Sequence, residues 1–188
     1  MKKARIYTDD FNRCIESTKR FTASVTGREM LQYIKLEFDC LTNTMAAIAL
    51  DGYRMSVEHA WVSDCEESFE VFIKGTVKLP KGKFAEISLE NKEVIIRCDG
   101  LIFGFSQPDL EYLQWKKLIP QSKESYKIAV NGDYLLSALQ AAKVSSAKDY
   151  HKMVVLEFRG KLDPIILRTN DKNIKMILPI RVRDEEDA

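Results

Sequence analysis

The stretch ALDGYRMS, residues 49–56, gives the clearest local signal in the sequence. The run TMAAIAL that leads into it is apolar and strand-like, Asp51-Gly52 is a turn dipeptide, and YRMSVEHAWV alternates like a second strand. The pattern predicts a β-hairpin. A turn-adjacent Tyr53-Arg54 pair has no evident reason to exist in a hydrophobic core, so we expect this hairpin to form one wall of a binding groove.

Composition limits the classes of protein that the chain can belong to. The 188 residues are 45% apolar and 30% charged, with a net charge of +1. A general nucleic-acid binder would be strongly basic, so only a local basic face remains open. No apolar run approaches the roughly 18 residues that span a bilayer, and MKKARIYTDD has no apolar core of a signal peptide. We therefore expect a cytoplasmic protein with no membrane partner.

Cysteine and histidine spacing argues against metal and cofactor chemistry. The four cysteines form no C-x-x-C pair, and neither histidine lies near one of them; these residues are Cys14, Cys40, Cys65, Cys98, His59 and His151. Free thiols, with no zinc site, catalytic residue or cofactor, are the prediction. Nucleotide-binding and hydrolase motifs are also missing from the sequence, which favours a binding or scaffold protein over an enzyme.

Periodicity predicts a strand-rich chain with two helices. The first helix covers residues 9–24, with Asp9 or Asp10 as its N-cap and apolar positions Phe11, Cys14, Ile15, Thr18 and Phe21. The second covers residues 133–145, with Tyr134, Leu135, Ala138, Leu139 and Ala142 on one side, after the amide or acidic cap in VNGDY. Strands are predicted at 4–10, where the alternating segment runs into the first helix, and at 32–40, 44–50, 53–62, 67–79, 84–91, 93–100, 101–109, 126–133, 153–160, 163–171 and 173–182.

The same order of elements, β-α-β-β-β, occurs at the start and again after residue 125, whereas residues 66–120 supply strands but no helix. This order predicts an α+β fold of antiparallel sheets with helices on one face. The predicted domains are 1–122 and 123–188, the second ending in the acidic tail RDEEDA.

Four segments in register carry a family resemblance. They are ALDGYRMS, YLQWKKLIP at 112–120, VNGDYLLSAL at 130–139 and MILPIRV at 176–182. The sequence resembles the bacterial DNA polymerase III beta subunit, the sliding clamp, whose TDGYRL-like, FPDYRRVIP-like, VNxxYLLDAL-like and LIMPVRL-like segments follow the same order. Residues 4–120 are similar to its middle domain without the second helix, and 126–183 to the second half of its last domain. The resemblance therefore implies a shortened, DNA-clamp-like relative.

The resemblance also implies a pocket for short linear motifs of polymerase or repair proteins. An apolar floor rimmed by arginines, a tyrosine and an amide suits a peptide with hydrophobic anchors. For Met55, Leu118 and Leu178 a plain core role between a sheet and a helix remains open. The implied lining is Tyr33 or Ile34, Leu50, Gly52, Tyr53, Arg54, Met55, Leu113, Lys117, Leu118, Asn131, Tyr134, Met176, Leu178, Pro179, Ile180 and Arg181.

Clamps encircle duplex DNA, so the resemblance implies helix faces that meet phosphates without reading sequence. The residues in question are Arg13, Lys19, Arg20, Lys143, Lys148 and Lys152. Such a role requires a homo-oligomeric ring, with a clamp loader as the further partner that opens it. The alternative is a protein-interaction module that keeps the peptide pocket without encircling DNA. Oligomeric state separates the two, because a monomer of this size cannot surround a duplex.

Overall fold

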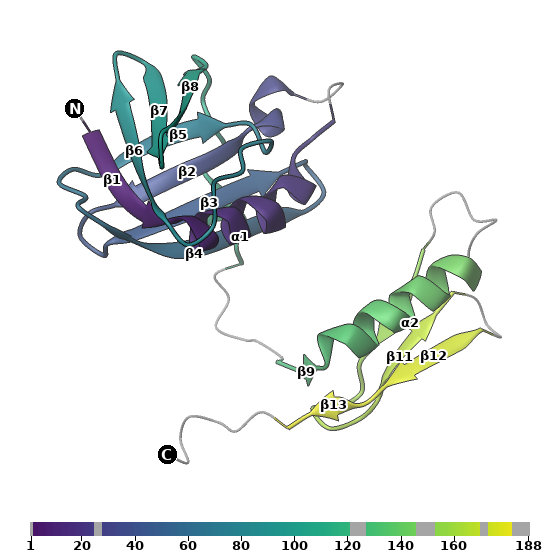
Figure 1. The fold of residues 1–188 in the computed structure, drawn as a ribbon. Helices are drawn as coiled ribbons and strands as arrows, with labels where there is room; N and C mark the ends of the chain where they lie inside the picture. The colour runs from purple at the N-terminus through teal and green to yellow at the C-terminus, as the bar shows by residue number, and fades with distance from the viewer. Residues whose placement is uncertain (1, 25–27, 121–126, 146–152, 170–172, 182–188) are drawn as a thin grey trace. The chain divides into compact units, whose positions relative to one another are not determined.

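The computed structural model describes all residues except 1, 25–27, 121–126, 146–152, 170–172 and 182–188. Two compact units make up the chain, unit 1 over Met1–Leu118 and unit 2 over Ile119–Ala188 (Figure 1). Within the described residues, each unit combines antiparallel strands with one α-helix, which confirms the predicted α+β class.

Unit 1 is built on one eight-stranded antiparallel sheet in the order β5-β2-β3-β4-β1-β6-β7-β8. Tight turns at residues with positive φ, among them Asn43, Asn91 and Asp99, join neighbouring strands of the sheet. The strands are β1 (Lys2–Tyr7), β2 (Ile34–Asp39), β3 (Thr44–Leu50), β4 (Met55–Ser63), β5 (Phe69–Ile73), β6 (Phe84–Glu90), β7 (Glu93–Cys98) and β8 (Leu101–Ser106).

The sheet joins two halves that exchange their first strands. The leading half, residues 2–63, sends β1 to pair with β6, and the trailing half, residues 69–106, sends β5 to pair with β2. Because each half completes the edge of the other, the two share one hydrophobic core. The trailing half has no α-helix, as the sequence predicts; residues 74–83 connect β5 to β6 without regular structure.

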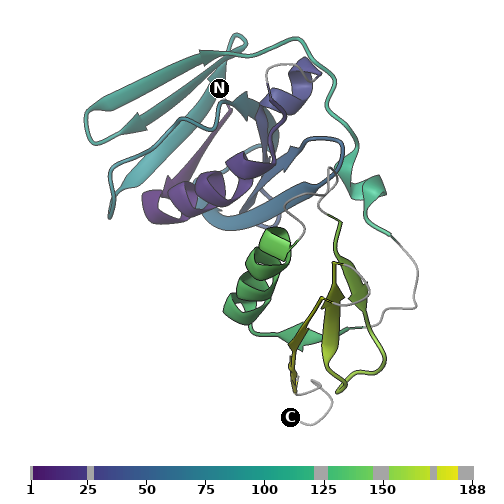
Figure 2. The ribbon, with the colours of Figure 1, turned by 90° about the vertical axis from the view of Figure 1, so that its right-hand side faces the viewer.

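Helix α1 (Thr8–Thr18) lies against β3 and β4 on one face of the sheet (Figures 1 and 2). Its predicted apolar positions Phe11, Cys14 and Ile15 are all buried. The predicted start was wrong: the helix begins one residue earlier, because the Thr8 hydroxyl is held by the backbone of Lys83, and no side chain caps it. The predicted end at residue 24 was also wrong, since a 3₁₀ turn, η1 (Lys19–Phe21), replaces the last part.

The opposite face of β2 and β3 is covered by a second apolar cluster. The short 3₁₀ helices η2 (Glu29–Gln32) and η3 (Trp115–Leu118) flank it. The Tyr112 hydroxyl donates to the Ile48 carbonyl oxygen at 3.4 Å, and burial raises the pKa of Tyr112 to about 12. Trp115 Nε1 donates to Glu37 Oε1 at 3.0 Å. These contacts fix the segment 112–118 across the sheet.

Unit 2 repeats the β-α-β-β-β order on a smaller scale. Helix α2 (Gly132–Ser145) packs on β11 (Ile165–Arg168) and β12 (Ile174–Ile177), and β10 (Val155–Glu157) completes a three-stranded sheet beside β11. The short strands β9 (Ala129–Val130) and β13 (Pro179–Ile180) pair separately.

Two details of unit 2 differ from the predictions. The side of α2 predicted to be apolar is only partly buried: Ala138 and Ala142 are buried, but Tyr134 and Leu139 are exposed, because the small sheet covers a narrow strip of the helix. The predicted last strand, 173–182, divides into β12 and β13. Pro179 has no backbone N–H and cannot continue the ladder of β12 with β11.

Candidate peptide-binding and nucleic-acid surfaces

The turn of the DGYR hairpin is organised by one carboxylate. Asp51 Oδ1 accepts hydrogen bonds from the backbone N–H groups of Tyr53, at 3.0 Å, and Arg54, at 3.1 Å. Gly52 has a φ of 95°, which an L side chain rarely adopts. The turn therefore projects Tyr53 into solvent, where its side chain is 99% exposed. A fully exposed tyrosine on a rigid turn is a suitable contact for a partner.

Arg54 has a structural role that the sequence did not reveal. Its Nε donates to Asp51 Oδ2 at 2.8 Å, and its guanidinium lies 5.2 Å from the centre of the Phe21 ring. The hydrogen bonds from Arg54 and from the Tyr53 backbone hold the pKa of the Asp51 carboxyl below its usual range. In this pair the Arg54 side chain braces the turn, whereas the Tyr53 side chain is exposed and only its backbone N–H takes part in the turn.

The other predicted residues of unit 1 gather around the second apolar cluster. Leu50 is buried in it, and Tyr33, Met55 and Leu113 pack against its edge. Lys117 and Leu118 are exposed on η3. The hairpin and the closing segment therefore meet in one packed region, in which Leu50 supports the surface from beneath.

In unit 2 a groove of about 460 Å³ runs between α2 and β12. Three predicted residues, Tyr134, Met176 and Leu178, line it. Their side chains are exposed, so they are not core residues within this unit. The remaining walls are small or apolar, with Lys175 as the basic group, and comprise Ser137, Ala138, Ala141, Lys175 and Ile177.

The predicted residues next to this groove have separate roles. Asn131 Oδ1 accepts from the backbone N–H of Asp133 at 2.8 Å and of Tyr134 at 3.3 Å, so Asn131 caps α2 as the sequence predicts. Pro179 and Ile180 form β13, and Arg181 is exposed just beyond it. The cap fixes the first turn of the helix, from which Tyr134 projects.

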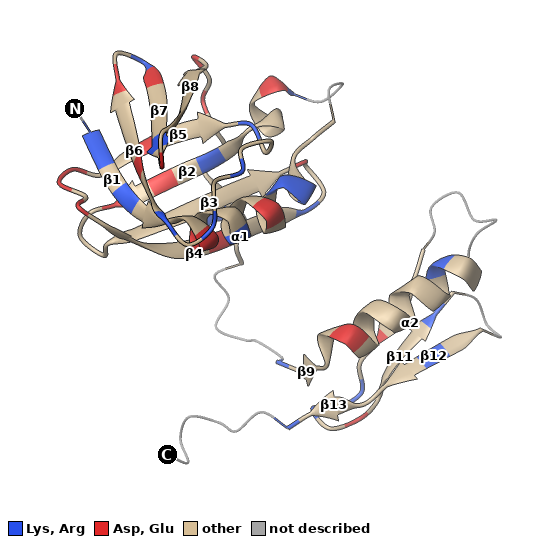
Figure 3. Cartoon of the chain, viewed as in Figure 1, with Lys and Arg blue, Asp and Glu red and all other residues tan. Residues whose placement is uncertain are grey.

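The cations predicted to face DNA are less available than the sequence suggests. Arg13 is tied to β4 by Glu58, at 2.9 Å, and by the carbonyl oxygen of His59, at 2.8 Å. Lys19 and Arg20 lie on η1 rather than α1, and Lys19 pairs with Glu16 at 2.5 Å. Figure 3 shows acidic and basic residues interspersed along α1. Lys143 is exposed on α2, whereas Lys148 and Lys152 lie outside the described residues.

A basic segment that the sequence analysis missed lies beside α1. The sequence KGTVKLPKGK, residues 74–83, contains four lysines and no acid. Val77 and Leu79 are buried in the core, while Lys78 and Lys81 are exposed and line a groove of about 820 Å³ against α1. The bond from Lys19, with the charges of Lys19, Arg20 and Lys78, lowers the pKa of Glu16. The alternation of lysine with apolar residues is the sequence signal that could have revealed this segment.

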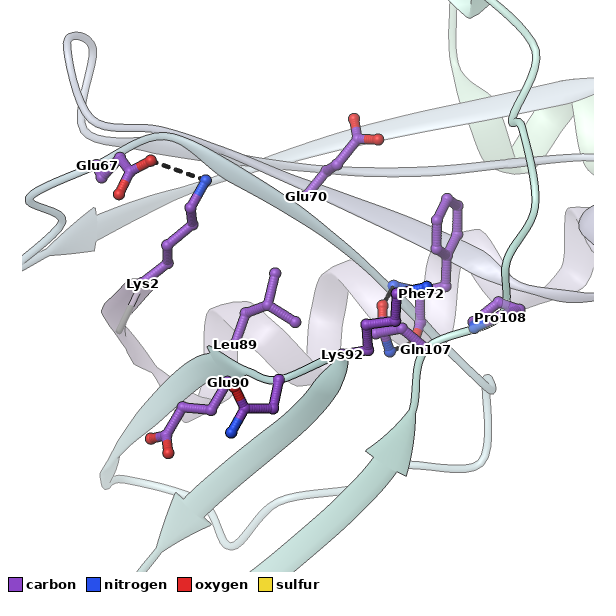
Figure 4. A pocket seen from close by; sticks show the side chains of 10 residues that line it. Lys2, Glu67, Glu70, Phe72, Leu89, Glu90, Lys92, Gln107 and Pro108 are labelled. Atoms are coloured by element: carbon purple, nitrogen blue, oxygen red, sulfur yellow. Dashed lines mark hydrogen bonds and ion pairs between the residues drawn. The ribbon is translucent and has the colours of Figure 1, made fainter.

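Another pocket, of about 630 Å³, lies between β5 and the turn after β6 (Figure 4). On one side Lys2 and Glu67 form an ion pair at 2.8 Å. On the other, the Gln107 amide accepts from the Phe72 N–H at 2.7 Å and donates to the Phe72 carbonyl oxygen at 3.0 Å. Gln107 thus closes the edge of β5. The mixed charges that line the pocket select no ligand class.

Among the described residues, no cluster of histidine, cysteine and acidic side chains could hold a metal ion. None of the helices in the described part of the chain is long and apolar enough to cross a membrane.

Comparison with solved structures identifies the architecture. The beta chain of DNA polymerase III from Streptococcus pneumoniae matches with a TM-score of 0.78 at 16% identity, over 98% of this chain and 51% of that one. The DNA polymerase sliding clamp from Bacillus subtilis matches with a TM-score of 0.68 at 16% identity, over 96% and 64%. This chain has the sliding-clamp fold. The family resemblance predicted from the four segments is therefore confirmed at the level of the fold.

A third clamp structure, from Bartonella birtlesii with griselimycin bound, matches with a TM-score of 0.62 at 12% identity, over 88% of this chain and 46% of that one. The chain spans 46% to 64% of the length of these three clamps. No family model and no curated protein matches the sequence. At these identities the likeness establishes the clamp fold alone.

Proposed function

We propose that this protein is a non-catalytic accessory of DNA replication that, like a sliding clamp, tethers polymerase or repair partners to duplex DNA. The observation that carries the proposal is the groove of unit 2. Tyr134, Met176 and Leu178 come from two of the segments that resemble the clamps, and they line one apolar groove on a clamp fold. In this proposal the chain acts in a homo-oligomeric ring that a clamp loader opens.

The chemistry of the groove specifies the kind of ligand. Tyr134, Met176 and Leu178 offer an apolar surface, and methionine adapts to side chains of several shapes. Lys175 adds a positive charge at the same groove, although its Nζ also contacts the Ser145 hydroxyl at 2.6 Å. A short extended peptide with two apolar anchors and one acidic residue fits this arrangement. The exposed Tyr53 of the hairpin is, in our proposal, a separate contact surface on unit 1.

Binding of a defined probe tests the groove. We expect a fluorescent peptide with adjacent leucine and phenylalanine anchors and one aspartate to bind, and the double substitution Tyr134→Ala/Met176→Ala to weaken binding about tenfold or more. Griselimycin, which a clamp of this fold binds, is a second probe. Leu136→Ala, on the same helix but outside the groove, is the control and keeps full affinity. Equal affinity of the double variant and wild type would refute the groove as the site.

Duplex DNA contact is assigned to the basic segment 74–83 together with Lys19 and Arg20. Phosphate contacts release counterions, so each one contributes about 0.9 to the slope of log K against log salt. We expect Lys78→Gln/Lys81→Gln to lower that slope by about 2, measured by fluorescence anisotropy on a labelled duplex. Lys92→Gln/Lys161→Gln removes the same charge elsewhere and is the control. An unchanged slope in the first variant would contradict the assignment.

The second candidate function is a protein-interaction module that binds linear peptides without encircling DNA. The pairing of Arg13 with Glu58 and of Lys19 with Glu16 favours it, because paired cations interact less with phosphate. If peptides bind the groove while duplex DNA does not bind at low salt, this second function is the correct one.

A further inference from the structure

Unit 2 exposes large apolar side chains that its own sheet and helix do not cover. On α2, Leu136 and Leu139 are 55% and 39% exposed. On and beside β10, Leu156 and Phe158 are 43% and 51% exposed. Because α2 packs on β11 and β12, the face of β10 has no cover among the described residues.

Unit 1 shows how the same arrangement of elements is completed. The leading half has the order β1-α1-β2-β3-β4, which unit 2 repeats as β9-α2-β10-β11-β12. In both, the helix packs on the last two strands. In unit 1 the trailing half then covers what remains, since Val77 and Leu79 join the core beside α1 and β5 pairs with β2.

Equivalent positions make the difference between the units concrete. Ile15 and Leu139 each lie seven residues after the start of their helix, but Ile15 is 2% exposed. Leu36 and Leu156 each face a buried residue of the next strand in register, and Leu36 is fully buried. The apolar face of unit 2 is therefore the face that the trailing half covers in unit 1.

The unpaired strand edges of unit 2 indicate the same open surface as its exposed apolar side chains. In unit 1 the outer edge of β1 is filled by β6 and that of β2 by β5. In unit 2, β9 pairs with β13 and β10 pairs with β11, and the other edge of each strand has no partner strand among the described residues. Two free edges beside an apolar face define a surface that fits another β-α-β-β-β block.

We propose that unit 2 of a second copy of this chain occupies this surface, so that two copies complete one clamp-type domain. The exchange in unit 1 is reciprocal, first strand to second strand in both directions, and two identical blocks can satisfy it around a two-fold axis. β9 of each copy then pairs with β10 of the other. This inference rests on the fold and does not depend on the proposed function.

The exposed groups and the charges of this surface suit a second copy. A stable interface buries about 800 Å² per partner, and a second copy would cover both the half-exposed apolar side chains and the two strand edges. Antiparallel pairing brings Lys127, two residues before one β9, beside the end of the β10 of the other copy. Glu157 lies there, and its carboxylate also contacts Arg168.

The mass of the full chain in solution, measured by light scattering during gel filtration, tests the proposal. We expect an even multiple of the chain mass of 21.6 kDa, at least twice that mass, at micromolar concentration, because any larger ring would be built from such pairs. Leu136→Lys/Leu139→Lys should halve that mass, whereas Tyr134→Lys, on the groove side of α2, should not change it. A monomeric wild type, or a double variant that keeps the wild-type mass, would overturn the proposal.

A disulfide trap gives a second readout if the lysine variant does not fold. In a background with Cys40→Ser and Cys65→Ser, we expect Ala129→Cys and Val155→Cys, carried on two differently tagged copies, to cross-link under mild oxidation, because antiparallel pairing that sets Lys127 beside Glu157 places Ala129 opposite Val155. Each variant alone should give little cross-linked product, since β9 meets β10 and not another β9. Cross-linking that is no greater in the mixture than in either variant alone would also overturn the proposal.

Discussion

The two units of this protein have the same order of elements, but they bury their apolar side chains to different extents. In unit 1 the leading half shares its core with a trailing half that carries no α-helix, and Phe11 and Ile15 are buried. In unit 2 the equivalent face is open, and Leu139 is exposed. The difference shows that a single β-α-β-β-β block cannot bury its apolar residues alone, and that a second block, or strands that replace it, must complete the core.

The surfaces that carry the predicted ligand-binding residues of the two units differ as well. In unit 1 the segment 112–118 crosses β2 and β3, and Tyr112 and Trp115 seal that face. In unit 2 a groove stays open between α2 and β12. The open groove keeps Tyr134 and Met176 accessible, so the smaller unit offers the better defined surface for a ligand.

The largest expected effect is on the stability of β2, the second strand of unit 1, compared with β10, the second strand of unit 2. We expect Leu36→Ala to cost about 3 kcal/mol of unfolding free energy, because it leaves a cavity in a full core. Leu156→Ala should cost less than about 1 kcal/mol in dilute solution, where its side chain is exposed. Both tryptophans, Trp61 and Trp115, lie in unit 1, so urea titration followed by fluorescence reports Leu36→Ala and circular dichroism reports Leu156→Ala. Similar losses would contradict the comparison.

A smaller effect is expected at the fifth residue of each helix. Asn12 Nδ2 donates to the Leu79 carbonyl oxygen at 2.8 Å, and its Oδ1 accepts from the Leu79 N–H at 2.9 Å. Asn12→Ala leaves both backbone groups of a buried residue without partners and should cost about 1–3 kcal/mol. Leu136→Ala, at the equivalent position of α2, should cost almost nothing in dilute solution. Urea titration of both variants measures the difference, and equal stabilities would show that the loop does not rely on Asn12.

The smallest expected effect is the loss of the contribution of Asp51 to stability at low pH. Asp51 and Asn131 make the same pair of backbone hydrogen bonds, but only Asp51 titrates. Since its pKa is lowered in the folded state, its contribution is complete above the ordinary Asp value of about 3.9 and is lost as pH falls through the lowered value. A carbon NMR titration of the Asp51 carboxyl should give a midpoint below that value. The chemical shift of the Asn131 side-chain amide, which caps α2, should not change over the same pH range. A midpoint at the ordinary value would contradict the hydrogen-bonded turn.

Local sequence patterns predicted most of the strands and both helices. The Asp51-Gly52 turn and the Asn131 cap are short-range signals, because the side chain bonds to its own neighbouring backbone. The start of α1 could not be predicted, since the Thr8 hydroxyl is held by Lys83, 75 residues away. The family resemblance supplied the groove residues, which belong to segments that no local pattern connects.

Other features depend on contacts between distant parts of the chain. Arg54 was expected to face a ligand, yet it also braces the turn, which depends on where Phe21 lies. Arg13 was expected to face DNA, yet Glu58 on β4 holds it. The basic segment 74–83 was predicted to be part of a strand and a turn. Its role as a basic surface could not be predicted, because that role depends on its position beside α1.

Retention on DNA tests the clamp-like function most directly. The protein is loaded on a nicked circular duplex, with a clamp loader if it does not load unaided, and the bound fraction is followed by gel filtration with light scattering before and after the circle is linearised. The account predicts an oligomer that stays on the circle and is released by linearisation. Loss from both forms alike, or no association with DNA by a monomer or simple dimer, would contradict it and leave peptide binding as the function.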